Sequence, residues 1–209
     1  VVDGADGQLA RLSGRASPSG EIVDGMCDYF GHGILYTLLA TRLDDSLGWI
    51  AWAVAIGAGI SRAVQSVFAE SQRRTYQWWV YGVPWLQTAK SEKSGVGEHL
   101  SALYLWAWHK MSGPTQRVNA LVESAAADPA ERRRIAEIAY AAGRTTLPVV
   151  ALLGANARTV MLGLSMIAGS SLWFFLIELV VLNVVLGFAI AQAAASGRRI
   201  AQLIARGNR

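Results

Sequence analysis

The sequence predicts an all-α protein, a polytopic membrane helix bundle, and its composition and apolar runs lead to this fold class. Of its 209 residues, 53% are hydrophobic and only 16% are charged, which is an unusual balance for a water-soluble domain. Residues 46–61 contain no charged residue, and residues 159–197 contain only Glu178. A helix crosses a bilayer with about 20 mostly apolar residues. The second run is therefore long enough for two spans joined by a turn.

A third apolar stretch, residues 22–41, differs from the other two because it carries Asp24, Asp28 and His32. Polar groups at membrane depth are costly unless they line a cavity or a functional site. We therefore expect residues 22–41 to form a membrane span that contributes to the site.

The distribution of basic residues predicts the topology. Of the 19 Lys and Arg residues, only Arg42 falls in the predicted outer turn, residues 42–46. Basic loops stay on the cytoplasmic side of a membrane. Residues 22–41 should then run outward, residues 47 to about 68 should return, and the last two spans should form an out-and-back pair. We expect an integral protein of a bacterial inner membrane, with its site facing the cytoplasm and without a nucleic-acid partner.

The chain reads as one membrane-embedded domain, residues 1–209, with two amphipathic additions. The first is a cytoplasmic insertion at about 71–147, and the second is a basic tail at about 197–209. Pro148 favours the start of a new helix. This helix would carry Arg158 into the bundle.

The beginning of the chain has no complete span before its first acidic residues. A helix that bears Asp3 and Asp6 would need roughly fifteen further apolar residues to cross a bilayer. We therefore expect one or two N-terminal spans to precede Val1 in the native protein.

The first 28 residues contain a regular polar pattern. Its members are Asp3, Asp6, Gly7, Ala10, Arg11, Gly20, Asp24 and Asp28. The first five recur at three and four residues and so share one helical face, with Arg11 about 12 Å along the axis from Asp3. The last three form a second column, and the segment between them is long enough to turn the second helix back beside the first.

Four carboxylates brought together at membrane depth would repel one another unless cations joined them. Mg²⁺ takes oxygen ligands from a few carboxylates and leaves positions for substrate phosphate. Two such ions can hold both the attacking and the leaving oxygen of a phosphoryl transfer. Gly7 and Gly20 would let a nucleotide approach the backbone, and Arg11 supplies a planar fork for phosphate oxygens.

The pattern Asp3-x2-Asp6-Gly7-x2-Ala10-Arg11-x8-Gly20-x3-Asp24-x3-Asp28 resembles the signature of the CDP-alcohol phosphotransferases at every defined position and in every gap. The resemblance implies a six-helix membrane fold. It also implies transfer of a phosphatidyl group from a CDP-linked donor, CDP-diacylglycerol above all, to a hydroxyl, with release of CMP. Two Mg²⁺ or Mn²⁺ ions are the implied cofactors.

The same resemblance implies roles for the individual residues. Metal ligands would be Asp3, Asp6, Asp24 and Asp28, and Asp28 would also be the general base. Contacts to the CDP portion would be Gly7, Ala10, Arg11 and Gly20.

Two other functions fit part of this pattern. The donor could be a soluble CDP-alcohol with a diacylglycerol-type acceptor, since the motif concerns only the CDP portion. A divalent-cation transporter would also place acids at membrane depth. Such a transporter has no need of Arg11 in register with the acids, or of Gly20 in their column, and these residues favour the transferase.

Arg62 and Arg158 are candidates for binding the acceptor, because a buried guanidinium needs an anionic partner. Either could instead pair with Glu178 or with one of the aspartates. If one of them receives a substrate anion, the acceptor is a phosphorylated polyol. The expected partners are the two substrates and the lipid bilayer, and a second copy of the chain is a further candidate.

Overall fold

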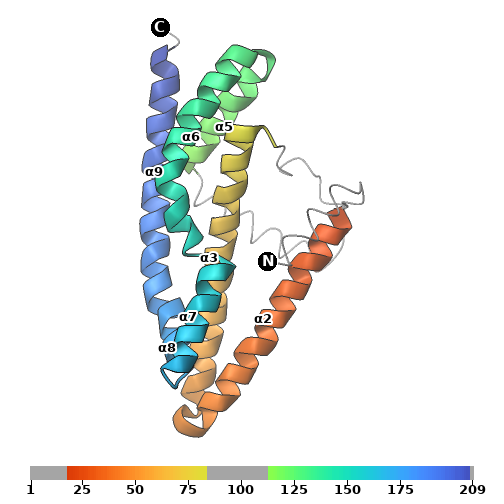
Figure 1. Cartoon of the computed structure of the whole chain (residues 1–209), viewed down its shortest axis with the longest axis vertical. Helices are drawn as coiled ribbons and strands as arrows, with labels where there is room; N and C mark the ends of the chain where they lie inside the picture. Colours follow the sequence, from red (N-terminus) through yellow and green to blue (C-terminus); the bar gives the residue numbers. More distant parts are fainter. Residues whose placement is uncertain (1–17, 84–112, 208–209) are drawn as a thin grey trace. The chain divides into compact units, whose positions relative to one another are not determined.

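The computed structural model describes residues 18–83 and 113–207, of which 93% are helical and none is in a strand (Figure 1). The all-α prediction is confirmed. Within these ranges, three helical stretches are long and apolar enough to cross a membrane, Trp49–Tyr81, Pro129–Ile167 and Leu172–Arg206. The chain is an integral membrane protein.

The chain forms two compact units that divide within helix α3 (Trp49–Tyr81), between Gly59 and Ile60. The first unit contains α2 (Pro18–Leu47) and the beginning of α3. Helix α2 covers the expected span, residues 22–41, but it is not among the three stretches apolar enough to cross a membrane. Its acidic residues and glycines dilute its apolar content.

The turn between α2 and α3 lies later than predicted, since α2 continues through residues 42–46 and ends at Leu47. The turn residue is Gly48, with φ +57°, and its N–H donates to the Asp44 carbonyl at 2.8 Å. This left-handed conformation is favourable for glycine because glycine has no Cβ.

Within the first unit, the buried side chains of α2 and α3 are alanines, leucines and one tyrosine. The buried residues are Tyr36, Leu39, Ala40, Leu43, Ala51, Ala55 and Ala58. A Cβ added at Gly59 would lie 3.7 Å from the Tyr36 ring. Small residues at such positions let membrane helices approach closely.

The second unit begins with the rest of α3 and contains α5 (Gly113–Ser124), the short helix η1 (Ala125–Ala127) and α6 (Pro129–Ala151). The Asp128 carboxylate caps α6 by accepting from the N–H groups of Ala130 and Glu131. Such a cap satisfies donors that have no partner inside the helix.

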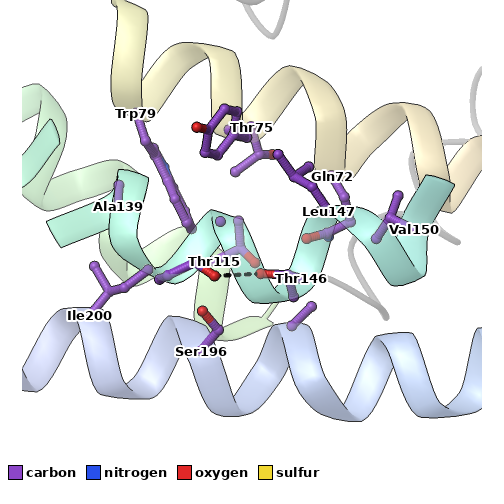
Figure 2. A pocket seen from close by; sticks show the side chains of 14 residues that line it. Gln72, Thr75, Trp79, Thr115, Ala139, Thr146, Leu147, Val150, Ser196 and Ile200 are labelled. Carbon is purple, nitrogen blue, oxygen red and sulfur yellow. Dashed lines mark hydrogen bonds between the residues drawn. The ribbon is translucent and has the colours of Figure 1, made fainter. Parts of the chain in front are cut away.

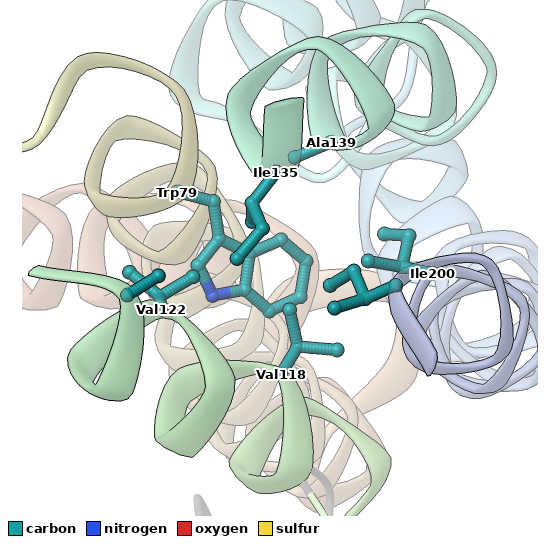
Figure 3. Packing of buried hydrophobic residues seen from close by; sticks show 8 residues of the cluster. Trp79, Val118, Val122, Ile135, Ala139 and Ile200 are labelled. Carbon is teal, nitrogen blue, oxygen red and sulfur yellow. The ribbon is translucent and has the colours of Figure 1, made fainter. Parts of the chain in front are cut away.

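A hydrophobic core joins α3, α5, η1, α6 and α9 in this unit (Figure 3). Its members, called the Trp79 cluster below, are Trp79, Val118, Val122, Ala125, Ile135, Ala139, Ile200 and Ile204. The Trp79 indole N–H donates to the Asn119 side-chain oxygen at 2.7 Å. Arg132 donates to the carbonyls of Trp78 and Trp79, each at 2.6 Å, and so holds the end of α3 against α6.

Pro148 lies inside α6, so the prediction that it begins a new helix is wrong. Proline removes one hydrogen bond, here to the Arg144 carbonyl, but its φ is helical, and apolar helices supported by neighbours tolerate it. The break comes after Ala151, and Gly154 is the N-cap of α7 (Ala155–Ile167).

The last apolar run forms two helical segments joined by a turn at residues 168–171, where Gly169 has φ +84°. The second segment contains α8 (Leu172–Leu176), the π-helical turn η2 (Ile177–Val181) and α9 (Leu182–Gly207). Helix α9 continues without a break through residues 197–207, where the sequence predicted an amphipathic tail. It packs against α5 and α6.

Candidate functional site

The predicted acidic site falls partly in the described chain. Residues Asp3, Asp6, Gly7, Ala10 and Arg11 lie outside the described residues. Gly20, Asp24 and Asp28 lie in α2, but their side chains are also outside the described part. Because residues four apart occupy successive turns of one helical face, the backbone confirms that these three form one column. Their roles stay predictions.

The column on α2 fits a hard divalent cation by its chemistry. Residues 24 and 28 are aspartates four residues apart in the sequence, and carboxylate oxygens are the ligands that Mg²⁺ and Mn²⁺ prefer. Among the side chains that the structure describes, no group of three or more His, Cys, Asp and Glu could hold a metal ion. The predicted ligands are not among those side chains, so the metal site stays a prediction.

A buried polar group lies between the apolar helices of the second unit. Its members, called the Glu178 cluster below, are Arg62, Gln65, Arg158, Glu178 and Asn183. They come from α3, α7, η2 and α9. Gln65 and Glu178 are fully buried, and Arg158 is 2% exposed. The cluster thus places three charged side chains inside helices that are otherwise mostly apolar.

Arg158 is held from several sides. Its Nε lies 3.1 Å from Glu178 Oε1, and its Nη2 donates to Gln65 Oε1 at 2.7 Å. Its Nη1 donates to the carbonyl of Leu153, in the turn between α6 and α7, and to the Ser66 hydroxyl at 3.3 Å. Arg158 therefore holds the turn between α6 and α7 and ties α7 to α3.

Arg62 makes a longer contact with the same carboxylate. Its Nη1 lies 3.8 Å from Glu178 Oε1, and its side chain is 14% exposed. Both arginines thus have the internal carboxylate partner that the sequence allowed. Their role toward an acceptor stays a prediction.

Two uncharged residues complete the Glu178 cluster. The Gln65 amide donates to the Glu178 carbonyl at 3.1 Å and to Asn183 Oδ1 at 3.2 Å. The Asn183 amide donates to the Ser61 hydroxyl at 2.9 Å and to the Leu179 carbonyl at 2.8 Å. π-Helical turns such as η2 are frequent at functional sites.

Sequence reasoning did not single out Gln65 and Asn183. A signal was present, because Ser61 and Gln65 are polar residues one turn apart on an apolar helix. Polar residues at membrane depth are rare and usually face a partner.

A small cavity lies beside the Trp79 cluster, between α3, α5, α6 and α9 (Figure 2). Its volume of about 30 Å³ has room for one or two water molecules. The hydroxyl of Thr75, which lines it, is buried without a hydrogen-bond partner among the described residues. An ordered water is the usual partner of such a group. The cavity is far too small for a CDP-linked lipid.

Comparison with known proteins decides the family. A family model described as CDP-alcohol phosphatidyltransferase matches residues 1–122, which is more than half of the chain. The chain belongs to this family. No curated protein and no solved structure matches it significantly. Members are phosphotransferases that move a phosphoalcohol group from a CDP-alcohol to an alcohol acceptor. The matched range includes the whole acidic pattern and Arg62, whereas Arg158 and Glu178 lie beyond it.

Proposed function

We propose that this phosphotransferase moves a phosphatidyl group from CDP-diacylglycerol to a hydroxyl acceptor and releases CMP, with its site on the cytoplasmic side of a bacterial inner membrane. The observation that carries the proposal is the complete eight-residue pattern from Asp3 to Asp28 inside the range matched by the family. A lipid donor is consistent with a chain whose helices are apolar enough to lie in a bilayer.

The chemistry requires one proton transfer and one exchange at phosphorus. Asp28 accepts the proton of the acceptor hydroxyl. At the same time the oxygen of that hydroxyl forms a bond to the phosphorus that carries diacylglycerol. The bond from that phosphorus to the bridging oxygen breaks, and CMP leaves. Asp3, Asp6, Asp24 and Asp28 would hold two Mg²⁺ or Mn²⁺ ions, which supply positive charge for the developing negative charge.

The remaining motif residues would hold the nucleotide. Gly7, Ala10 and Gly20 allow the CDP portion to approach the backbone closely, because none has a side chain larger than methyl. Arg11 can bind two phosphate oxygens at once.

The acceptor that we propose is a phosphorylated polyol, such as inositol phosphate or glycerol phosphate. The support is the Glu178 cluster, in which Arg62 and Arg158 share one carboxylate. The three side chains together carry one net positive charge, which suits an anionic acceptor better than a neutral lipid alcohol.

Replacement of the general base tests the reaction. Asp28→Asn should lower the rate at least a hundredfold while metal-dependent binding of CDP stays measurable, because general-base catalysis contributes about 10²–10⁴-fold. Asp45→Asn, an exposed acid on the same helix, is the matched control and should keep the wild-type rate. A rate above about a tenth of wild type in Asp28→Asn would rule out this base.

A product screen tests the substrates. Purified protein would receive Mg²⁺ or Mn²⁺ with CDP-diacylglycerol and a panel of alcohols, or with soluble CDP-alcohols and diacylglycerol. Mass spectrometry of the lipids would identify the product. If lipid product formed only from soluble CDP-alcohols and diacylglycerol, the donor would be a soluble CDP-alcohol and not CDP-diacylglycerol. If the protein bound metal but no cytidine nucleotide, the result would favour the divalent-cation transporter.

Cysteine labelling tests the orientation. In a Cys27→Ser background, Asp45→Cys should react with a membrane-impermeant reagent from outside the cell, whereas Ser124→Cys should not. Both native side chains are exposed. The reverse pattern would place the site on the outer side of the membrane.

A further inference from the structure

The cavity beside the Trp79 cluster is lined by a threonine or a serine from each of the four helices around it. Thr75 belongs to α3, Thr115 to α5, Thr146 to α6 and Ser196 to α9 (Figure 2). Thr75 is 2% exposed and Thr115 is 4% exposed. Aliphatic hydroxyl groups from four helices thus meet at one buried place.

The Thr75 hydroxyl limits what the cavity can hold. It is buried and has no hydrogen-bond partner among the residues that the structure describes. A buried hydroxyl without a partner is unfavourable, because it has lost its hydrogen bonds to water and gained none in return. The Thr146 hydroxyl already donates to the Ala142 carbonyl at 2.9 Å, but a hydroxyl that donates can still accept. One group at the cavity therefore lacks a partner, and a second can accept another hydrogen bond.

The lining residues and the volume exclude several classes of occupant. None of the 14 described residues that line the cavity is charged, so a metal ion or a phosphate would find no opposite charge among them. An apolar group would leave the Thr75 hydroxyl without a partner. The volume of about 30 Å³ suits water, which can donate to one hydroxyl and accept from another.

We propose that this cavity is a binding site for an ordered water molecule, which bonds to the Thr75 hydroxyl and to a hydroxyl from at least one other helix. Buried waters typically make about three hydrogen bonds, and Thr115, Thr146 and Ser196 supply the further positions. Thr75 and Thr115 lie within the range that the family model matches, whereas Thr146 and Ser196 lie beyond it. The water therefore joins helices of the matched range to two helices that follow it.

The direct test is an experimental structure of the full-length protein in lipid nanodiscs, at a resolution that shows buried water. We expect density for a water molecule at about 2.8 Å from Thr75 Oγ1. The same density should lie within hydrogen-bond distance of a hydroxyl from α5, α6 or α9. A cavity without this density, or a Thr75 hydroxyl bonded to a protein atom in its place, would overturn the proposal.

Thr75→Val distinguishes a hydrated cavity from a dry one by the sign of its effect on the melting temperature. Valine has nearly the shape of threonine but no hydroxyl. In a hydrated cavity the change removes a hydrogen bond of the water, so Tm should fall by about 2–4 °C. In a dry cavity it would remove a hydroxyl that has no partner, so Tm would rise. Circular dichroism of the purified protein in detergent measures the shift, and an unchanged or raised Tm contradicts the proposal.

Thr145→Val on α6 is the matched control. Thr145 is exposed, is not among the residues that line the cavity, and donates its hydroxyl to the Ala142 carbonyl at 2.9 Å. The same substitution there should change Tm much less, because water or detergent surrounds the side chain. An equal fall in Thr145→Val would contradict a specific role of the cavity hydroxyl.

Thr75→Ser keeps the test valid if Thr75→Val does not fold. Serine retains the hydroxyl and loses only a methyl group, so the water density should remain in this variant. Loss of that density in Thr75→Ser, with the helices unchanged, would contradict the hydroxyl as the group that holds the water.

Discussion

The Trp79 cluster and the Glu178 cluster hold the same unit together with opposite kinds of side chain. In the Trp79 cluster, eight apolar residues from α3, α5, η1, α6 and α9 are buried, and Trp79 also makes a hydrogen bond to Asn119. In the Glu178 cluster, an arginine, a glutamate and a glutamine are almost completely buried. The Trp79 cluster is apolar, like the core of a soluble protein, whereas the Glu178 cluster consists of buried polar and charged side chains.

The environment explains the difference. Around the Glu178 cluster, the helices present large apolar side chains outward, among them Val160, Leu164, Ile167, Val184 and Phe188. Lipid tails are as apolar as these side chains, so apolar burial drives helix association only weakly there, and polar contacts contribute more. The Trp79 cluster lies in the segment that we expect outside the bilayer, where burial from water is favourable. The two clusters should therefore respond differently to mutation.

The strongest test of this contrast removes one charge from the Glu178 cluster. Arg158→Ala should lower the free energy of unfolding by about 3–5 kcal/mol, because it leaves a buried carboxylate without its main partner. The measurement is unfolding in a titration with sodium dodecyl sulfate, followed by the helical circular dichroism signal. Arg158→Leu combined with Glu178→Leu should cost less, since the two paired charges are removed together and Arg62, which is 14% exposed, is the one member of the cluster that stays charged. Equal losses in the single and double variants would contradict the assigned ion pair.

The corresponding test in the Trp79 cluster removes apolar volume. Trp79→Ala should lower the free energy of unfolding by about 3 kcal/mol, because it opens a cavity among side chains from α5, α6 and α9. Trp49→Ala is the control, since Trp49 is 77% exposed and should contribute little in detergent. If both variants lost a similar amount of unfolding free energy in the same titration, burial of Trp79 would not explain its contribution to stability.

A close approach beside the Trp79 cluster gives a smaller expected effect. A Cβ at Gly143 would overlap the ring of Tyr76, whereas a Cβ at Gly187 meets no atom within 4 Å. Gly143→Ala should therefore cost about 2 kcal/mol through overpacking. Gly187→Ala should be neutral or slightly stabilising because alanine is the better helix former. Thermal unfolding by circular dichroism would compare the two, and Tyr76→Leu should restore stability to Gly143→Ala.

The smallest expected effect concerns the polar edge of the Trp79 cluster. Asn119→Ala removes the acceptor of the Trp79 indole N–H and should lower the free energy of unfolding by about 1 kcal/mol. In a double-mutant cycle, Asn119→Ala should have almost no effect once Trp79 is replaced by Phe. Additive losses would show that Asn119 stabilises the protein through some other contact.

The sequence alone determined the helical membrane fold, the family and the candidate residues of the acidic site. These features are local or compositional, since apolar runs, helical spacing and an eight-residue pattern can be recognised without knowing which helices meet. Gly20, Asp24 and Asp28 share a helical face for the same reason. Local signals were less accurate at helix ends, where α2 ran past its predicted turn to Gly48 and α6 continued through Pro148. Each helix end depends on the neighbours that satisfy its backbone groups.

Only the tertiary structure decided which partner each buried polar side chain has. Arg62, Arg158 and Glu178 are far apart in sequence, and the sequence left open whether the arginines pair with Glu178 or with an aspartate. The structure brings Arg62 and Arg158 to one carboxylate on η2, and it adds Gln65, which accepts from Arg158 and donates to Asn183. An isolated charge inside apolar helices is costly, so each buried arginine requires an anionic partner. Several carboxylates in the sequence could serve as that partner, and the sequence does not distinguish among them. Packing of α3, α7 and α9 selects among them.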